Sequence, residues 1–189
     1  MVEIALHVLD IAENSVTAGA KRVEIDVEED TSADRLRLVI EDDGQGMDPE
    51  MLTQAVDPFT TTRSTRRVGL GLSFLKEAAE RCNGHLTVES TPGRGTRVIA
   101  EFQRSHIDRA PLGDLAGTFL TLLIGFSDIR WIFHYRVDDQ EFSFDSEPIR
   151  RGLGDIRFTD PVVLGFLRRT LEEGVARVQS RQMSKLQVH

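Results

Sequence analysis

The stretch IEDDGQGM, residues 40–47, stands where an alternating segment of the chain gives way to turn-forming residues. The residues before it, RLRLVI at 35–40, alternate apolar and charged side chains as a strand with one solvated face does. Gly44 and Gly46 let the backbone bend sharply and approach a ligand closely. An acidic residue at the strand end, Asp42, is well placed to accept a hydrogen bond. Taken alone, the stretch is more simply explained as an ordinary Asp-Gly turn.

Helices and hairpins alternate on both sides of this stretch. Hydrophobic periodicity and turn residues predict a helix over 3–17, strands over 22–28 and 35–40, a short helical piece over 49–56, a helix over 70–81, and strands over 85–89 and 96–102. This order predicts an α+β fold, a sandwich in which a mixed, mostly antiparallel sheet is covered by helices on one face.

A boundary near residue 104 divides the chain into a first domain, 1–104, and a C-terminal extension, 105–189. The extension is predicted to be a small α-β-β-α unit: a helix over 112–124, a hairpin over 129–144, and a last helix that begins at Asp160-Pro161. Its aromatic stripe of Trp131, Phe133 and Tyr135 is expected to lie in the core. The extension either completes the sheet or helix layer of the first domain or carries a partner contact.

Composition excludes several classes of protein. The chain has 189 residues, a net charge of −8 and one cysteine, Cys82, so an internal disulfide and a multi-cysteine metal cluster are excluded. Negative charge disfavours nonspecific binding to nucleic acid or anionic membranes. The longest apolar run, residues 115–126, is too short to cross a bilayer, and the first residues lack a signal-peptide pattern. We therefore expect a soluble cytoplasmic protein with no nucleic-acid partner and no membrane insertion; the sequence indicates no oligomeric state.

Two further stretches carry chemistry. In DIAENS, residues 10–15, Asp10 and Asn14 are four residues apart and share one helix face. A carboxylate and an amide oxygen so placed can activate water and bind a hard cation such as magnesium, although a solvated face explains the pattern more simply. In DPFTTTRSTRRVGLGLSF, residues 57–74, hydroxyls, arginines and two glycines lead into a helix N-terminus, which favours phosphate. The alternative is a solvated basic loop, but a solvated loop does not explain why Gly69 and Gly71 stand beside the start of a helix.

Together with the turn STPGRGTRV at 90–98, these stretches resemble the GHKL superfamily of ATP-binding domains. That superfamily is shared by sensor histidine kinases, the DNA gyrase ATPase subunit, mismatch-repair ATPases and heat-shock chaperones. DIAENSVTAGA resembles its N box, DDGQGM its G1 box, DPFTTTR its F box, GLGL its G2 box and PGRGT its G3 turn. The resemblance covers residues 1–104, implies a Bergerat-type sandwich, and is strongest to the catalytic domain of histidine kinases. The sequence has no GxxxxGK[ST] motif, so a P-loop is not supported.

The resemblance implies how a nucleotide would be bound. Asp42 matches the acid that accepts a hydrogen bond from the adenine amino group. Gly44 and Gly46 match glycines that let the base approach, Met47 is expected to pack against the base, and Thr96 matches a hydroxyl near the adenine.

The resemblance also implies residues for the phosphate end of ATP. Asn14 matches the ligand of a Mg²⁺ ion that bridges the phosphate oxygens, and Arg63 stands where kinases often carry a lysine directed at the γ-phosphate. The backbone that wraps the phosphates is matched by Gly69, Leu70, Gly71 and Leu72.

One departure concerns the catalytic position. Members that hydrolyse ATP carry a glutamate four residues before the asparagine, whereas this chain has Asp10. The side chain is shorter by about 1 Å, and a misplacement of that size can lower a rate by about 10²-fold. Slow hydrolysis, or a contribution from Glu13, is therefore expected.

A second departure concerns the phosphoacceptor. Histidine kinases carry it on an upstream helical hairpin that this sequence does not show, so a stand-alone domain is expected, with the acceptor in another protein. His7 is expected to be a core or interface residue.

The resemblance implies an ATP-binding signalling or regulatory protein of the histidine-kinase type that uses Mg²⁺ and phosphorylates or regulates a separate partner protein. The alternatives are a slow Mg²⁺-dependent ATPase whose lid closure drives a conformational change, and an ATP sensor without turnover.

Overall fold

A computed structural model describes the backbone of residues 3–56 and 70–186 and the side chains of residues 3–56 and 70–180. In chain order, the described residues form α1 (Ile4–Thr17), β1 (Arg22–Asp30), β2 (Arg35–Asp42), α2 (Pro49–Val56), α3 (Gly71–Glu80), β3 (His85–Thr91), β4 (Gly95–Gln103), α4 (Leu115–Gly125), β5 (Arg130–Val137), β6 (Gln140–Asp145), α5 (Ser146–Leu153) and α6 (Pro161–Leu186). Within these ranges, no helix combines the length and apolar character needed to cross a membrane.

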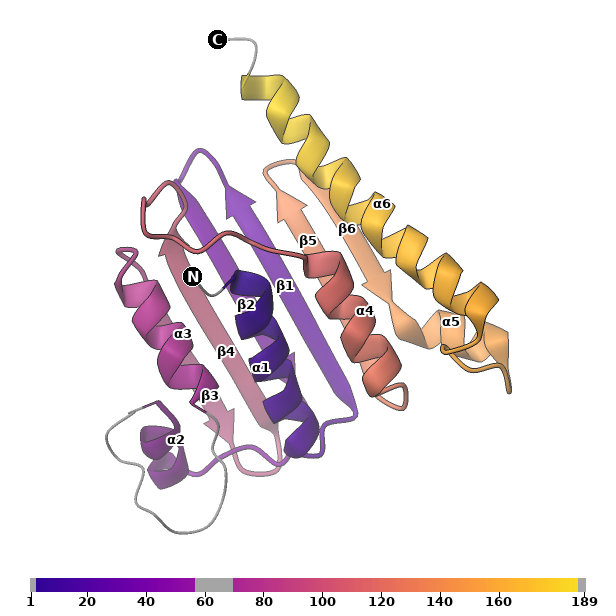
Figure 1. Ribbon diagram of the computed structural model, residues 1–189. Coiled ribbons are helices and arrows are strands. Elements are labelled where there is room, and N and C mark those ends of the chain that lie inside the picture. Colours follow the sequence, from indigo (N-terminus) through magenta and orange to yellow (C-terminus); the bar gives the residue numbers. More distant parts are fainter. Residues whose placement is uncertain (1–2, 57–69, 187–189) are drawn as a thin grey trace.

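The strands form one sheet in the order β3-β4-β2-β1-β5-β6. The β1–β5 pair is parallel, and the other neighbouring pairs are antiparallel. Figure 1 shows α1, α3, α4 and α6 side by side over one face of this sheet. The predicted α+β sandwich, with a mixed and mostly antiparallel sheet covered by helices on one face, is confirmed.

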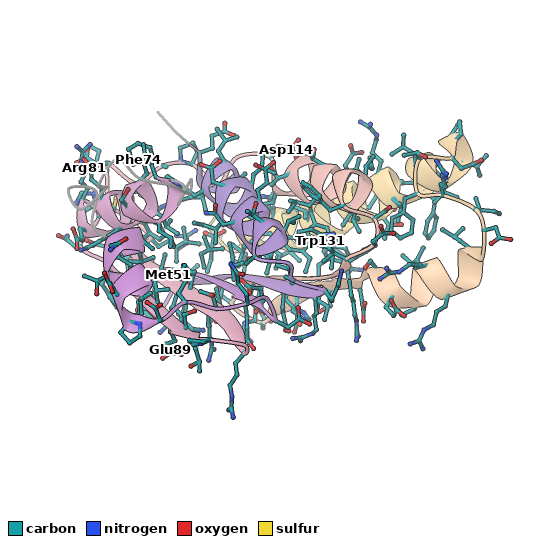
Figure 2. The ribbon with its side chains drawn as sticks, turned by 90° about the horizontal axis from the view of Figure 1, so that it is seen from below. Met51, Phe74, Arg81, Glu89, Asp114 and Trp131 are labelled. Carbon is teal, nitrogen blue, oxygen red and sulfur yellow. The ribbon has the colours of Figure 1, made fainter. Side chains whose placement is uncertain are left out.

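Alternation along the strands decides which face meets the helices. In β1, Val23, Ile25 and Val27 are buried, while the charged residues between them point to the other face. Because side chains alternate with period two, a slip of one residue would bring those charges into the core. Figure 2 shows Trp131 between the sheet and α4, with Glu89 of β3 on the opposite side of the sheet.

The C-terminal half of the chain extends the sheet of the first half. β5 pairs with β1 along its whole length, so that Ile25 faces Phe133 in the register. The connection to α4 runs back to the start of α1, where the carbonyls of Pro111 and Leu112 accept hydrogen bonds from the first two backbone N–H groups of the helix, both at 2.9 Å. These bonds satisfy donors that would otherwise lack helical partners.

A buried polar contact joins the two halves beneath the helices. Glu29 of β1 is only 4% exposed. Its Oε1 accepts a hydrogen bond from the hydroxyl of Tyr135 at 2.9 Å, and its Oε2 pairs with Nε of Arg104 at 2.9 Å. Burial raises the pKa of Tyr135, and the neighbouring Glu29 carboxylate raises it further. The buried carboxylate is therefore held by a cation from one half and a hydroxyl from the other.

The aromatic stripe of β5 is core, as predicted. Trp131, Phe133 and Tyr135 are almost completely buried. Phe119 of α4 stacks on Phe133 with ring centroids 4.7 Å apart. The indole N–H of Trp131 donates to the carbonyl of Phe126 at 3.0 Å, which satisfies its polar atom inside the core.

The extension holds one helix more than the predicted α-β-β-α order. This helix, α5, begins where the side chain of Asp145 accepts from the backbone N–H of Glu147 at 2.9 Å. It is only eight residues long and contains Pro148 and Gly152, which are poor helix formers. The last helix begins as predicted, with Asp160 accepting from the backbone N–H of Val162 at 2.9 Å.

Candidate functional site

Four segments meet at one end of the sheet. These are the C-terminal end of α1, the end of β2, the β3–β4 turn and the start of α3, which lie together at the lower edge of Figure 1. The loop after β2 is tied to two of them: the N–H of Gln45 donates to the carbonyl of Ala18 at 2.9 Å, and its carbonyl accepts from Gly93 at 2.7 Å. Backbone hydrogen bonds thus hold the DDGQGM loop between α1 and the turn.

Asp42 lies at the centre of this arrangement and is 9% exposed. Its Oδ2 accepts from the hydroxyl of Ser15 at 2.7 Å. Its Oδ1 accepts from the N–H of Gly44 at 2.9 Å and from that of Thr96 at 3.3 Å. An ionised carboxylate has about four acceptor positions, so these three donors fix the side chain and leave capacity for one more.

Gly46 fixes the course of the loop. Its φ is +65°, in the left-handed region, and a Cβ there would lie 2.1 Å from the carbonyl oxygen of Thr91. Only glycine fits such a close approach. The next residue, Met47, is half-buried against the core, and its N–H donates to Oγ of Ser90 at 2.8 Å. The Ser90 hydroxyl in turn lies 2.9 Å from the hydroxyl of Thr96.

A second group of predicted residues lies where α1 faces the start of α3. A Cβ on Gly71 would lie 3.3 Å from Cβ of Asp10 and 3.7 Å from Nδ2 of Asn14, so glycine allows the two helices to come close. Asp10 is exposed and Asn14 is half-buried. Among the described residues, neither side chain makes a hydrogen bond or ion pair. A carboxylate and an amide oxygen left free on one helix face are donors that suit Mg²⁺.

The remaining predicted residues lie on the segment before and at the start of α3. Leu70 is exposed, and its carbonyl accepts from the N–H of Phe74 at 2.9 Å and the hydroxyl of Ser73 at 2.8 Å. Leu72 is buried in the core. Arg63 and Gly69 lie outside the described residues.

The structure thus places the described candidates in two groups joined by α1. Asp42, Gly44, Gly46, Met47 and Thr96 gather around one carboxylate, and Asp10, Asn14 and Gly71 lie together nearby on the helix side. Asn14 and the Ser15 that holds Asp42 are consecutive residues, so one turn of α1 serves both groups.

Two residues of the site were missed by the sequence analysis. Ser15 occupies a position in the buried stripe of α1, and a hydroxyl in an otherwise apolar stripe is the signal that could have identified it. Asp43 accepts the backbone N–H groups of Lys21 and Arg22 at 2.7 and 2.9 Å, so it holds the start of β1. The G1-box resemblance selected Asp42 as the acceptor, but no local pattern indicated that Asp43 holds the start of β1.

His7 lies one turn before Asp10 and is 5% exposed. Its Nδ1 has no hydrogen-bond partner among the described residues. Burial lowers the pKa of His7, and the nearby Asp10 carboxylate opposes that shift. The neutral imidazole packs in the core, as the sequence led us to expect.

Comparison with protein families gives a match over the first half of the chain. The family model of histidine kinase-, DNA gyrase B- and HSP90-like ATPases matches residues 2–106. This region holds both groups of candidate residues. The match confirms the resemblance drawn from the four motifs.

Curated relatives match the same half. Sensor protein kinase FleS of Pseudomonas aeruginosa is 42% identical over 89 residues, which are 47% of this chain and 22% of FleS. A putative sensor histidine kinase, NtrY-like, of Rickettsia conorii is 26% identical over 106 residues, 56% of this chain and 17% of that protein. The chain thus matches about a fifth of the length of these relatives.

A solved structure supports the fold. The N-terminal domain of a DNA repair protein superposes with a TM-score of 0.53 and 15% identity, covering 77% of this chain and 52% of that one. The superposed share is larger than the family match, so part of the C-terminal half belongs to the shared fold.

Proposed function

Because the chain belongs to the family of histidine kinase-, DNA gyrase B- and HSP90-like ATPases, we propose that it binds Mg²⁺–ATP around Asp42 and acts on a separate partner protein as a signalling or regulatory protein of the histidine-kinase type. The family match and the sensor kinases among its relatives support the kinase type. We propose that the protein acts in the cytoplasm.

The observation that carries the proposal is the buried, fixed carboxylate of Asp42. Three donors orient it and leave one acceptor position. The exocyclic amino group of adenine supplies the missing donor, whereas guanine would present a carbonyl oxygen to the same carboxylate and leave both acceptors unpaired. Gly44 and Gly46 let the loop pack closely against Ala18 and Thr91, and Met47 offers the base an apolar surface.

The phosphate end of the nucleotide is assigned to the group on α1 and α3. Backbone N–H groups at the start of α3 favour phosphate oxygens, and Gly71 keeps this helix end beside Asn14. Asn14 would hold Mg²⁺, which neutralises phosphate charge when it is bound. Arg63 and Gly69 belong to this group by their motif.

Calorimetry with Mg²⁺–ATP tests the binding site. We expect Asp42→Asn to weaken binding by about 10- to 100-fold, the loss typical of a hydrogen bond to a charged group. Asp43→Asn is the matched control, because it removes the neighbouring carboxylate, which holds β1 instead of facing the site. Parent-like binding by Asp42→Asn, or no binding by the parent, would overturn the proposal.

Asp10 distinguishes transfer to a partner from hydrolysis. Its exposed carboxylate lies one helical turn from Asn14, a position from which it can take a proton from water or from an acceptor group. If the protein is a slow ATPase, Asp10→Asn should abolish phosphate release and leave ATP affinity unchanged. If the parent releases no phosphate, transfer of labelled phosphate to candidate partners separates a kinase from an ATP sensor.

A further inference from the structure

The face of the sheet opposite the helices carries a cluster that the proposed function does not use. Glu24 and Asp26 lie on β1 and His134 on β5, where His134 stands level with Asp26 in the parallel register. One donor atom from each of the three side chains lies within 4.8 Å of the other two. All three residues are half-buried among their neighbours on this face.

Glu24 turns one oxygen toward the cluster. Its Oε2 is paired with the guanidinium of Arg22. Its Oε1 lies 3.5 Å from Nε2 of His134. Arg22 thus holds the carboxylate from the far side and leaves one oxygen facing the imidazole.

Hydrogen bonds on β6 set the orientation of the imidazole. The hydroxyl of Ser143 donates its single proton to Oε1 of Glu141 at 2.8 Å. The same hydroxyl oxygen lies 2.8 Å from Nδ1 of His134, so while Ser143 donates to Glu141 it accepts the proton of Nδ1–H. In the neutral ring, Nε2 then carries a lone pair and lies 3.5 Å from Oε1 of Glu24. Two acceptors at this distance repel each other, and a metal ion bound between them would remove that repulsion.

Asp26 offers a third ligand, a carboxylate that is not bonded to another described residue. Among residues 3–56 and 70–180, its half-buried carboxylate makes no hydrogen bond and no ion pair. Burial raises the pKa of Asp26, and the nearby His134 and Arg37 offset that shift only in part, so a bound cation would stabilise the charged carboxylate.

We propose that Glu24, Asp26 and His134 bind a divalent transition-metal ion, and that Zn²⁺ is the ion that fits the donor set best. Imidazole nitrogen and carboxylate oxygens are ordinary zinc ligands, and three protein ligands leave a further position for water. The Ser143 bond to Nδ1 supplies the outer hydrogen bond that metal-bound histidines usually make.

The ion would join the two halves of the chain. Two ligands come from β1 and one from β5, so bound metal holds the parallel β1–β5 pair from the face opposite the Glu29–Tyr135 contact. An ion that binds only the folded chain stabilises it in proportion to its concentration. The site is independent of nucleotide binding because it lies on the other face of the sheet.

The test uses the full chain, stripped of metal with a chelator and without nucleotide. Calorimetry with Zn²⁺ should show one ion bound, and the melting temperature should rise with Zn²⁺ concentration. Co²⁺ should give visible absorption bands. His134→Gln and Asp26→Asn should each weaken Zn²⁺ binding at least 10-fold and remove the thermal shift.

The matched control is His85→Gln, which removes an exposed histidine from β3. It should bind Zn²⁺ as the parent does. Circular dichroism and unfolding without metal show whether each variant is folded, and the two ligand variants provide independent readings. Zn²⁺ binding to His134→Gln as tight as to the parent, or no binding by the parent, would overturn the site.

Discussion

The hydroxyl of Ser15 lies 2.7 Å from Oδ2 of Asp42, and this bond joins the first helix to the end of the second strand. Both residues are buried. The bond fixes the carboxylate and also sets the distance between the helix that carries Asn14 and the loop that follows Asp42. The geometry of the candidate site therefore depends on a residue expected to touch no ligand.

Ser15→Ala should lower the free energy of unfolding by about 1–3 kcal/mol, because a buried carboxylate oxygen loses its donor. It should also weaken Mg²⁺–ATP binding, since Asp42 is no longer held in place. Thr17→Ala is the control: within the described part of the chain its exposed hydroxyl bonds only to the carbonyl of Glu13 on the same helix, and its removal should change stability by less than about 0.5 kcal/mol. Urea unfolding measures the free energy of unfolding of both variants, and equal losses would refute the special role of Ser15.

Gly46→Ala should destabilise the protein far more than Gly93→Ala. Both glycines have positive φ, which costs an alanine about 1–2 kcal/mol. At Gly46 the added Cβ also meets the carbonyl of Thr91 at 2.1 Å, whereas at Gly93 no atom lies within 4 Å. We expect Gly46→Ala to cost about 1–3 kcal/mol more in chemical denaturation. Similar costs for the two variants would show that the loop shifts freely.

Tyr135→Phe should lower the free energy of unfolding by about 1–3 kcal/mol. The change removes the donor to Oε1 of buried Glu29 and leaves that oxygen without a partner. In a Glu29→Gln background the same change should have a smaller effect, because an uncharged amide is easier to leave unpaired. A double-mutant cycle measures the coupling, and additive effects would contradict it.

His7→Met should make the protein less sensitive to acid. Burial holds the pKa of His7 below the value of about 6.5 usual for imidazole, so the unfolded chain takes up a proton that the folded chain refuses. The contribution of neutral His7 to stability is therefore complete above the pKa that His7 has in the unfolded chain. It is lost as the pH falls toward the lower pKa of His7 in the folded chain. In urea unfolding, the free energy of unfolding of the variant relative to that of the parent should rise as the pH is lowered from 8 to 5.5. A constant difference would argue against a neutral buried His7.

The first half of the fold was predictable because its signals are local. Alternation gave β1 and β2, and Gly44 and Gly46 marked the loop that follows Asp42. The parallel pairing of β1 with β5 could not be predicted in the same way. Its partners are about a hundred residues apart in sequence, and both strands carry patterns that suit either direction of pairing.

The candidate site divides along the same line. Motif order identified Asp42, Asn14 and Gly71, because each type of residue has a chemical reason to stand where it does. Ser15 was missed because its contact with Asp42 joins two elements, and only the packing of α1 on the sheet reveals it. The role of Asp42 toward adenine and the roles of Asp10 and Asn14 toward phosphate and metal stay predictions, as does the division of the chain at residue 104.

The place of β5 has a practical consequence for anyone who shortens the chain. A version ending at residue 104 would turn β1 into the outermost strand, with a row of backbone N–H and C=O groups left open to solvent. Such a strand can recruit a second molecule, so the shortened protein should self-associate. In the full chain, β5 covers this edge of β1 by pairing with it along its whole length.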